Sequence, residues 1–519
     1  MFKNRMASEK LTSGFDLVSK EKYHYDERVL DEVVEYILDN HNNPTKIVEA
    51  LNIVYDDKNI LMLLLENGKF DSIQKLFDVS LIIFSNAKIL LHIDGRGDNV
   101  LGYFIEFAPY ELLENFIKLM RTHCSPEDIK SLLKHKRNDG RTPLMILCTN
   151  EKFKSLELVF KMIIDCLASV CGLDSMYNAL TASDAEGDNV LILAIKHKNF
   201  AVGSKILDLL AKTLPDLNDR NKIENEIVLS CDSKSNNSLM LLASQSCDDA
   251  KALQETILEI LKIRLDASLI ISLGRANADG NNVLMLGIIG RNTDLSDKII
   301  KIIQSTQKSI KAPLLCQICD QYNKNNDNFI SLAFQNDKSD LYLGLINEME
   351  LNLPPEKITD LFKKTLSLHH DLLHKALSVT NTNAIISIIK YVRQIKTLAL
   401  DEKEDMSNLI TRKDFMNRTL LTYAIASSNV EVCQLILEIA REFCDSLNLK
   451  LILTSKDSAG QTPYILSKLQ NNKNLVKCIQ DFAIITGNMR YIDSQEKDVF
   501  LIKKQQSAKI LPLAVKVFH

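Results

Sequence analysis

The sequence predicts an all-α fold: a solenoid of about ten stacked helix–turn–helix repeats. Three observations support this prediction. First, the 519 residues include only 16 glycines and 10 prolines, too few for the many turns of an all-β sandwich or barrel. Second, one short phrase of sequence returns ten times, at intervals of 40 to 48 residues. Third, apolar residues between the returns recur at i, i+3 and i+4 spacing, which is typical of amphipathic helices.

The repeated phrase is clearest from Asp184 to Ala194. Each copy has a large side chain, apolar in all but one copy, at the same place in the phrase, which we call the anchor. The ten anchors are Leu61, Leu101, Leu144, Leu191, Leu239, Leu284, Ile330, Leu373, Leu421 and Tyr464. Ten copies in register indicate a tandem array, in which each module buries its apolar faces against its neighbours.

The residues before each anchor predict a turn and then a helix start. Two residues before the anchor, every copy carries a side chain that can accept hydrogen bonds from the free N–H groups of a helix N-terminus. These capping residues are Asn59, Asn99, Thr142, Asn189, Asn237, Asn282, Asn328, Asp371, Thr419 and Thr462. Four residues before the anchor, five copies carry glycine and two carry asparagine, which favour a left-handed backbone.

A second helix and a third, short apolar segment are predicted in each module. In the second module, the stretch 111–120 places Leu113, Phe116 and Ile117 on one helix face. The third segment of that module follows Ser125, its expected cap.

Two parts of the phrase resemble the ankyrin repeat, whose fingerprint includes Thr-Pro-Leu-His-x-Ala. Thr142 to Leu144 and Thr462 to Pro463 match its start, and Leu373 to Ala376 matches its end. The chain therefore resembles an ankyrin-repeat protein with long, divergent repeats. Ankyrin repeats have about 33 residues and these have about 45, so the excess fits a longer second helix or an extra short helix. HEAT and armadillo solenoids fit the spacing better but lack the Gly-x-Thr-Pro-Leu turn.

Three regions follow from this reading. We expect an N-terminal helical cap in residues 1–50, which includes an amphipathic stretch from Asp31, and an ankyrin-like array in residues 51–490. Residues 491–519 are expected to form a C-terminal cap or tail. Its last 21 residues carry four lysines and no acid, which fits either a closing helix or frayed tail, or a linear signal.

Composition narrows the function classes. The net charge of −4 gives no global basic field, so we expect no nucleic-acid partner. No stretch of 18 apolar residues occurs, so we expect no membrane insertion. The start of the sequence has no apolar stretch typical of a secretory signal, and the 11 cysteines are an odd number, which favours reduced thiols in a cytoplasmic protein.

The sequence offers weak signals for catalysis. His370 and His374 have the spacing of a helical metal pair, but the register places Asp371 at a cap, with His370 outside the helix. Cys316 and Cys319 form a single pair with no second pair nearby. We therefore expect no catalytic, cofactor-binding or metal-binding residues. The alternative is a hydrolase-type enzyme with its site in the array, using His369, His370, His374 or Cys148.

The favoured function is a non-enzymatic scaffold that binds one or more proteins on a concave repeat surface. Its expected partner-binding residues lie at turn tips: Arg96, Arg137, Asn138, Glu186, Lys234, Lys324, Phe415 and Met416. Asp94, Asp184 and Asp279 are expected at the same tips. Phe415 and Met416 replace a polar pair and mark an apolar contact; the alternative is that they pack inward.

The resemblance also reaches a particular class of ankyrin-repeat protein. The Asn/Lys/Ile-rich composition without tryptophan is similar to that of effectors that intracellular bacteria deliver into the host cytoplasm by type IV secretion. This implies a virulence effector that binds a host protein. A third option is a regulatory subunit in its own cytosol.

Overall fold

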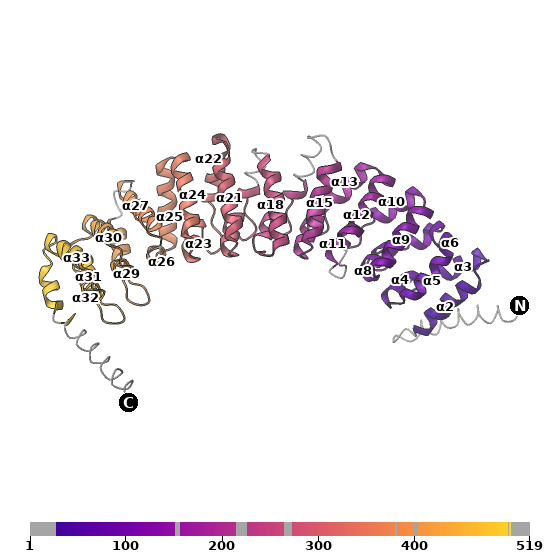
Figure 1. Cartoon of the computed structure of the whole chain (residues 1–519), viewed down its shortest axis with the longest axis horizontal. Helices are drawn as coiled ribbons and strands as arrows, with labels where there is room; N and C mark the ends of the chain where they lie inside the picture. The colour runs from indigo at the N-terminus through magenta and orange to yellow at the C-terminus, as the bar shows by residue number, and fades with distance from the viewer. Residues whose placement is uncertain are drawn as a thin grey trace, which may run out of the picture. The chain divides into compact units, whose positions relative to one another are not determined.

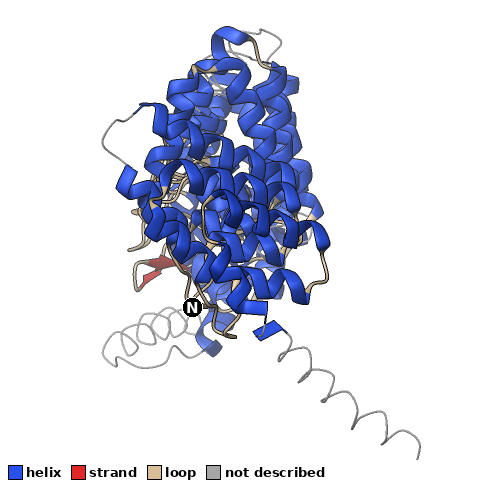
Figure 2. Ribbon diagram, turned by 90° about the vertical axis from the view of Figure 1, so that its left-hand side faces the viewer, coloured by secondary structure: helices blue, strands red, loops and turns tan. Residues whose placement is uncertain are grey.

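The computed structural model describes residues 27–150, 156–213, 226–263, 272–378, 381–398, 403–496 and 498–499. These residues are almost entirely helical (Figures 1 and 2). One two-stranded antiparallel sheet occurs among them, in which β1 (Val54–Tyr55) pairs with β2 (Lys58–Asn59). The chain divides into two compact units, residues 1–264 and 265–519. The predicted helical repeat class is confirmed.

Unit 1 contains the first five modules. Its helices are α2 (Glu27–Asp39), α3 (Pro44–Leu51), α4 (Ile60–Glu66), α5 (Phe70–Leu76), α6 (Ser80–Ser85), α7 (Ala87–Leu90), α8 (Val100–Phe107), α9 (Tyr110–His123), α10 (Pro126–Lys134), α11 (Pro143–Thr149), α12 (Leu156–Cys166), α13 (Leu173–Thr181), α14 (Val190–Lys196), α15 (Phe200–Thr213), α17 (Ser238–Leu242) and α18 (Asp248–Ile263). The described residues of unit 1 also include a 3-10 turn (Phe77–Val79) and a π-helical turn (Leu167–Cys171).

Unit 2 contains the other five modules. Its helices are α20 (Val283–Ile289), α21 (Thr293–Ser305), α22 (Lys308–Cys319), α23 (Phe329–Gln335), α24 (Ser339–Asn352), α25 (Pro355–Leu368), α26 (Leu372–Ser378), α27 (Thr382–Leu398), α28 (Lys403–Thr411), α29 (Leu420–Ala426), α30 (Val430–Phe443), α31 (Ser446–Thr454), α32 (Pro463–Leu469) and α33 (Lys473–Ile485).

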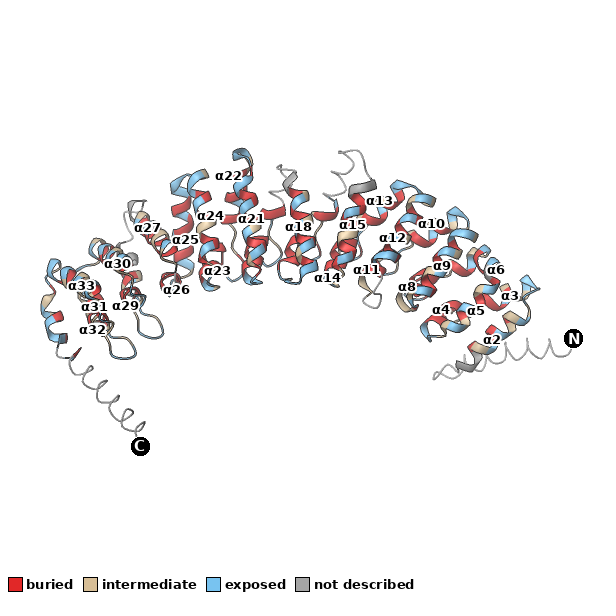
Figure 3. Cartoon of the chain, in the orientation of Figure 1, coloured by how far each residue is buried: buried red, intermediate tan, exposed pale blue. Residues whose placement is uncertain are grey.

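Equivalent helices of successive modules stack on one another. In unit 1 the first helices α4, α8, α11, α14 and α17 pack in that order, as do the second helices α9, α12, α15 and α18. In unit 2 the first helices α20, α23, α26, α29 and α32 form one row and the second helices α21, α24, α27, α30 and α33 another. The first helices are covered on nearly all sides: in α14 every residue from Val190 to Ile195 is buried (Figure 3).

The predicted helix starts are confirmed. In nine modules the capping residue immediately precedes the first helix, and its side chain accepts a hydrogen bond from the N–H of the third helical residue. Asp371 holds the same place directly before α26. Four residues before the anchor, nine of ten residues have a positive φ, and His369, with φ −123°, is the exception.

The capping asparagines have a second contact that explains their residue type. The Nδ2 of Asn99 donates to the carbonyl of Leu132 at 3.0 Å, and that of Asn189 to the carbonyl of Ile227 at 2.9 Å. Asn59 and Asn282 make the equivalent bond. Because aspartate has no such donor, only an amide both caps the first helix and holds the end of the third.

In six modules the described residues include a third helix, which accounts for part of the extra length of the repeat. These helices include α10, α13, α22, α25, α28 and α31, and they vary from 9 residues in α10 to 14 in α25. Ser125 caps α10 by accepting a bond from the N–H of Asp128 at 3.2 Å, as predicted. The second helices are long as well, with 14 residues in α9 and α30.

Both ends of the described array are covered by helices. At the start, α2 packs against α4 and α5. At the other end, residues 489–496 are helical, and Glu496 contacts Tyr464 and bonds to Lys468 at 3.1 Å. The lysine-rich stretch from residue 500 onward lies outside the described residues. The region boundaries at residues 50 and 490 stay predictions. No helix among the described residues is long and apolar enough to cross a membrane.

Candidate interaction surface

Eight of the ten loops before the first helices share one backbone geometry. In the fourth module, the N–H of Asp184 bonds to the carbonyl of Asp188, and the N–H of Gly187 bonds to the carbonyl of Asp184. The same two bonds close the loops that begin at Asp94, Arg137, Asp232, Asn277, Asn323, Asp414 and Asp457. Eight loops therefore present their side chains from a common frame.

An aspartate or asparagine stabilises seven of these eight loops from within. The carboxylate of Asp184 accepts hydrogen bonds from the N–H groups of Glu186 and Asp188, both at 2.9 Å. This overturns the expectation that Asp94 and Asp184 are exposed tip residues. They are only 6% and 8% exposed because their carboxylates fold back into the loop.

Neighbouring loops are bonded to one another. The N–H of Asn138 donates to the carbonyl of Arg96 at 3.2 Å, and the N–H of Ala185 donates to that of Asp139 at 2.9 Å. In unit 2 the same bond joins Lys324 to Asp279 and Ser458 to Met416, each at 2.9 Å. These bonds join the second, third and fourth loops in unit 1, and in unit 2 they join the sixth loop to the seventh and the ninth to the tenth.

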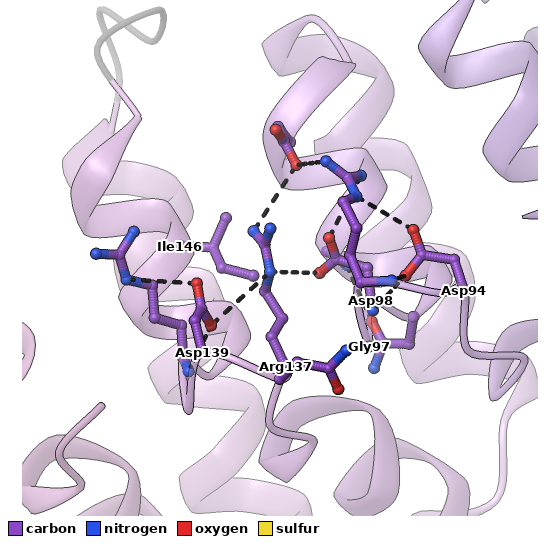
Figure 4. A network of polar contacts seen from close by, with 12 residues as sticks. Asp94, Gly97, Asp98, Arg137, Asp139 and Ile146 are labelled. Carbon is purple, nitrogen blue, oxygen red and sulfur yellow. Dashed lines mark hydrogen bonds and ion pairs between the residues drawn. The ribbon is translucent and has the colours of Figure 1, made fainter. Parts of the chain in front are cut away.

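The second and third loops carry a charged network (Figure 4). Arg96 lies 3.2 Å from Asp94, 3.4 Å from Asp98 and 3.6 Å from Glu106. Arg137 reaches across from the next loop to lie 3.4 Å from Asp98 and 3.9 Å from Glu106. Two arginines from adjacent modules thus share the same carboxylates.

Arg137 stands where the other seven loops have aspartate or asparagine. It therefore gives up the internal loop bonds and spans two modules instead. Part of the lost support is replaced by Asp139, whose carboxylate accepts the N–H of Arg141 at 3.0 Å. The side chain of Arg141 in turn lies 3.2 Å from Asp184, so the network continues into the fourth loop.

In this network the aspartates are buried and the arginines lie nearer the surface. The side chains of Asp94, Asp98 and Asp184 are each 1% exposed. Above them, the side chain of Arg96 is 41% exposed and that of Arg137 is 17% exposed. The surface therefore presents guanidinium groups that buried carboxylates hold in place.

Asp98 is the member of the network whose negative charge is least well stabilised. Burial raises its pKa to about 6, the repulsion of Asp94 and Glu106 adds to this, and Arg137 and Arg96 oppose it. One oxygen of Asp98 accepts no hydrogen bond. Gly102 makes room for the carboxylate, because a Cβ there would lie 2.6 Å from Asp98 Oδ1.

Asp94 shows the opposite behaviour in the same network. Burial alone would raise its pKa, but hydrogen bonds from the Tyr103 hydroxyl, the backbone of Asp98 and Arg96 outweigh burial and lower it. Its Oδ2 accepts the hydroxyl of Tyr103 at 2.7 Å, and Arg96 lies 5.0 Å from the centre of that ring.

The ninth loop, in unit 2, repeats this aspartate–tyrosine–arginine contact with a different arginine. Asp414 Oδ2 accepts the hydroxyl of Tyr423 at 2.8 Å, and Arg418 lies 4.2 Å from the centre of that ring. Its tip carries Phe415 and Met416, which are 90% and 38% exposed. These two side chains point outward, so the inward-packing alternative is wrong.

The other predicted partner-binding residues lie on separate loops. The structure brings together Arg96, Arg137 and Asn138, whose amide donates to the carbonyl of Gly95 at 3.0 Å. Glu186 and Lys234 are exposed on the fourth and fifth loops. Lys324 is exposed on the seventh loop and pairs with Asp279 at 2.9 Å.

The histidines of the enzyme alternative do not converge on a common point in the described residues. His369 bonds to the carbonyl of Asn326 at 2.9 Å, and His370 is exposed in the turn before α26. His374 is buried inside α26, and this burial lowers its pKa. Cys148 is also buried, which raises the pKa of its thiol. No group of three or more His, Cys, Asp or Glu in the described residues is arranged to hold a metal ion.

The comparisons with known proteins add little to this picture. No protein-family model matches the chain, and no curated protein matches it. One similar solved structure is a circular tandem repeat protein with novel repeat topology and enhanced subunit contact surfaces. It is 12% identical, the match covers 98% of this chain and 96% of that chain, and the TM-score is 0.22. At that TM-score the likeness carries no argument, so the repeat architecture rests on the chain's own helices, caps and loops.

Proposed function

We propose that this chain is a non-enzymatic protein-interaction scaffold, and that a protein partner binds the loop surface of unit 1. The observation that supports this most is the arrangement of Arg96 and Arg137, which are partly exposed and held by buried carboxylates. Arginines in fixed positions are frequent hot spots of protein interfaces.

The rigidity of the loops supports the same proposal. Because backbone bonds close the second, third and fourth loops and join them to one another, their tips are ordered before any partner arrives. Ordering such side chains during binding costs about 0.5 to 1.5 kcal/mol for each one, and a preorganised surface avoids much of that cost. In eight modules the residues at the tips vary on a common backbone frame, which suits specific recognition.

We assign the repeats to an ankyrin-like type. The support is the glycine turn with positive φ, the capped first helix and the bonded row of loops. A third helix in six modules makes those repeats longer than ordinary ankyrin repeats, which have about 33 residues.

The experiment is capture of partners by the whole chain from host and native lysates, followed by affinity measurements with the partner identified. Arg96→Gln is expected to weaken binding about tenfold or more. Arg121→Gln, the same change on the exposed face of α9, is the matched control and should leave the affinity unchanged. Equal effects of the two variants, or none, contradict this placement of the partner.

We also propose that the partner is a host protein and that the chain is an effector delivered by a type IV system. This rests on the composition and on the resemblance to such effectors. A translocation assay with residues 499–519 removed tests whether the lysine-rich end is the delivery signal. Undiminished delivery of the shortened chain excludes that role.

A further inference from the structure

Phe415 is the most exposed large apolar side chain among the described residues, at 90%, and Met416 beside it is 38% exposed. We call these two residues the apolar tip. The corresponding residues of other loops are small, polar or charged: Gly95 with Arg96, Asn138 with Asp139, Ala185 with Glu186, Lys324 with Asn325, and Ser458 with Ala459. The ninth loop therefore departs from the pattern of the array.

The backbone of the apolar tip is held by hydrogen bonds. The carboxylate of Asp414 accepts the N–H groups of Met416 at 2.8 Å and Arg418 at 2.7 Å. The N–H of Ser458 in the tenth loop donates to the carbonyl of Met416 at 2.9 Å, so the two loops lie side by side. Hydrogen bonds therefore hold the backbone on either side of Phe415.

The charges around the tip are basic. Arg412, Lys413 and Lys456 are exposed on the ninth and tenth loops. The two acids of these loops are turned inward: Asp414 is engaged by Tyr423 and Arg418, and Asp457 accepts the N–H groups of Ala459 and Gln461. Three exposed cations thus lie within three residues of the start of these two loops, next to an exposed aromatic side chain in the sequence.

We propose that the apolar tip docks on an anionic lipid surface, with Phe415 entering the headgroup region and Arg412, Lys413 and Lys456 facing the lipid charges. The inference goes beyond the scaffold function. A protruding side chain suits a bilayer because a fluid interface closes around it, whereas a protein interface buries about 800 Å² on each partner with matched shape. Aromatic side chains with basic neighbours are favoured at membrane–water interfaces. No membrane-spanning helix is required.

The chain contains no tryptophan, so Phe415→Trp places a single fluorescent reporter at the tip. The full chain is titrated with vesicles of phosphatidylcholine and phosphatidylserine in equal amounts, and with phosphatidylcholine alone. We expect a blue shift of the emission with the anionic vesicles only, reversed by high salt. Ala185→Trp, at the equivalent place in the fourth loop beside Glu186, is the control and should show no shift.

Cosedimentation of the chain without a reporter gives an independent readout. Phe415→Ser should abolish binding to the anionic vesicles, and Lys413→Gln should lower the partition coefficient about fivefold. Lys301→Gln, an exposed lysine of α21, should leave it unchanged. No blue shift with anionic vesicles, or the same shift at position 185, overturns the proposal and assigns the tip to a protein contact instead. Failure here leaves the Arg96 experiment unaffected, because the two surfaces lie in different units.

Discussion

The second and ninth loops have the same backbone frame, but the second presents a charged surface and the ninth an apolar one. In both, an aspartate closes the loop and accepts a tyrosine hydroxyl, and an arginine stacks on that tyrosine. In the second loop this arginine is Arg96, at the third position of the loop, and Asp98 occupies the fifth. In the ninth loop the arginine is Arg418, at the fifth position, and Met416 occupies the third. Moving one cation by two positions converts a charged network into an apolar tip.

The largest expected effect comes from removing the shared aspartate. Asp94→Ala deletes a buried acceptor of two backbone N–H groups and of Tyr103, and should cost about 3 kcal/mol of unfolding free energy. Asp414→Ala should cost about half as much, because the Asp414 side chain is more exposed, at 9% against 1%. Urea denaturation of both variants checks the order. Equal losses contradict the view that the second loop is the more tightly buried of the two.

Asp98→Asn is expected to stabilise the protein at neutral pH by about 1 to 3 kcal/mol. The pKa of Asp98 is raised from its usual 3.8 to about 6, so its protonation stabilises the folded state. That contribution is present below about pH 4 and is lost as the pH rises through about 6. The gain from the substitution should therefore vanish near pH 4, as followed by urea denaturation at several pH values. A gain that is independent of pH contradicts the assignment.

Arg137→Asn tests the departure of the third loop from the others. Asparagine restores the internal loop acceptor while removing the cation that most lowers the pKa of Asp98. Stability should change by less than about 1 kcal/mol at neutral pH, and the pKa of Asp98 should rise further, as read from its carboxyl resonance. Arg141→Asn, which breaks a contact with Asp184 instead, should leave that resonance in place.

The smallest effect on stability is expected at the apolar tip. Phe415→Ala together with Met416→Ala should change the free energy of unfolding by less than about 0.5 kcal/mol, with a correspondingly small change in melting temperature. The same double variant should weaken binding to the anionic vesicles. Calorimetry alongside the vesicle assay measures both. A large loss of stability places these side chains in the core and removes the contrast with the second loop.

The local features of the fold could be predicted from the sequence because local chemistry determines them. Asn99 and Asn189 mark helix starts since a short acceptor is needed there, and Gly187 marks a turn because its φ is positive. Seven copies of the phrase also have an aspartate or asparagine seven residues before the anchor. This pattern indicates a loop whose own N–H groups bond to that side chain.

The contacts between modules could not be predicted in the same way. Arg137 and Asp98 are far apart in sequence, and nothing at either position indicates the other. The burial of Asp94 was missed because charged turn residues are usually solvated, whereas here the loop's own N–H groups replace water. For Phe415 the pattern left exposure and inward packing open, and the exposure of the side chain in the folded structure decides between them.

Where one loop is bonded to the next, the bond links equivalent backbone atoms, whatever side chains the two loops carry. Deleting residues 144–190 would join Pro143 directly to Leu191, which removes the length of one module and keeps the spacing of the remaining anchors. Arrays of this kind can lengthen or shorten by exchange of complete units in the gene. Surfaces evolved on one copy, such as that of the ninth, can then be moved along the array without redesigning their neighbours.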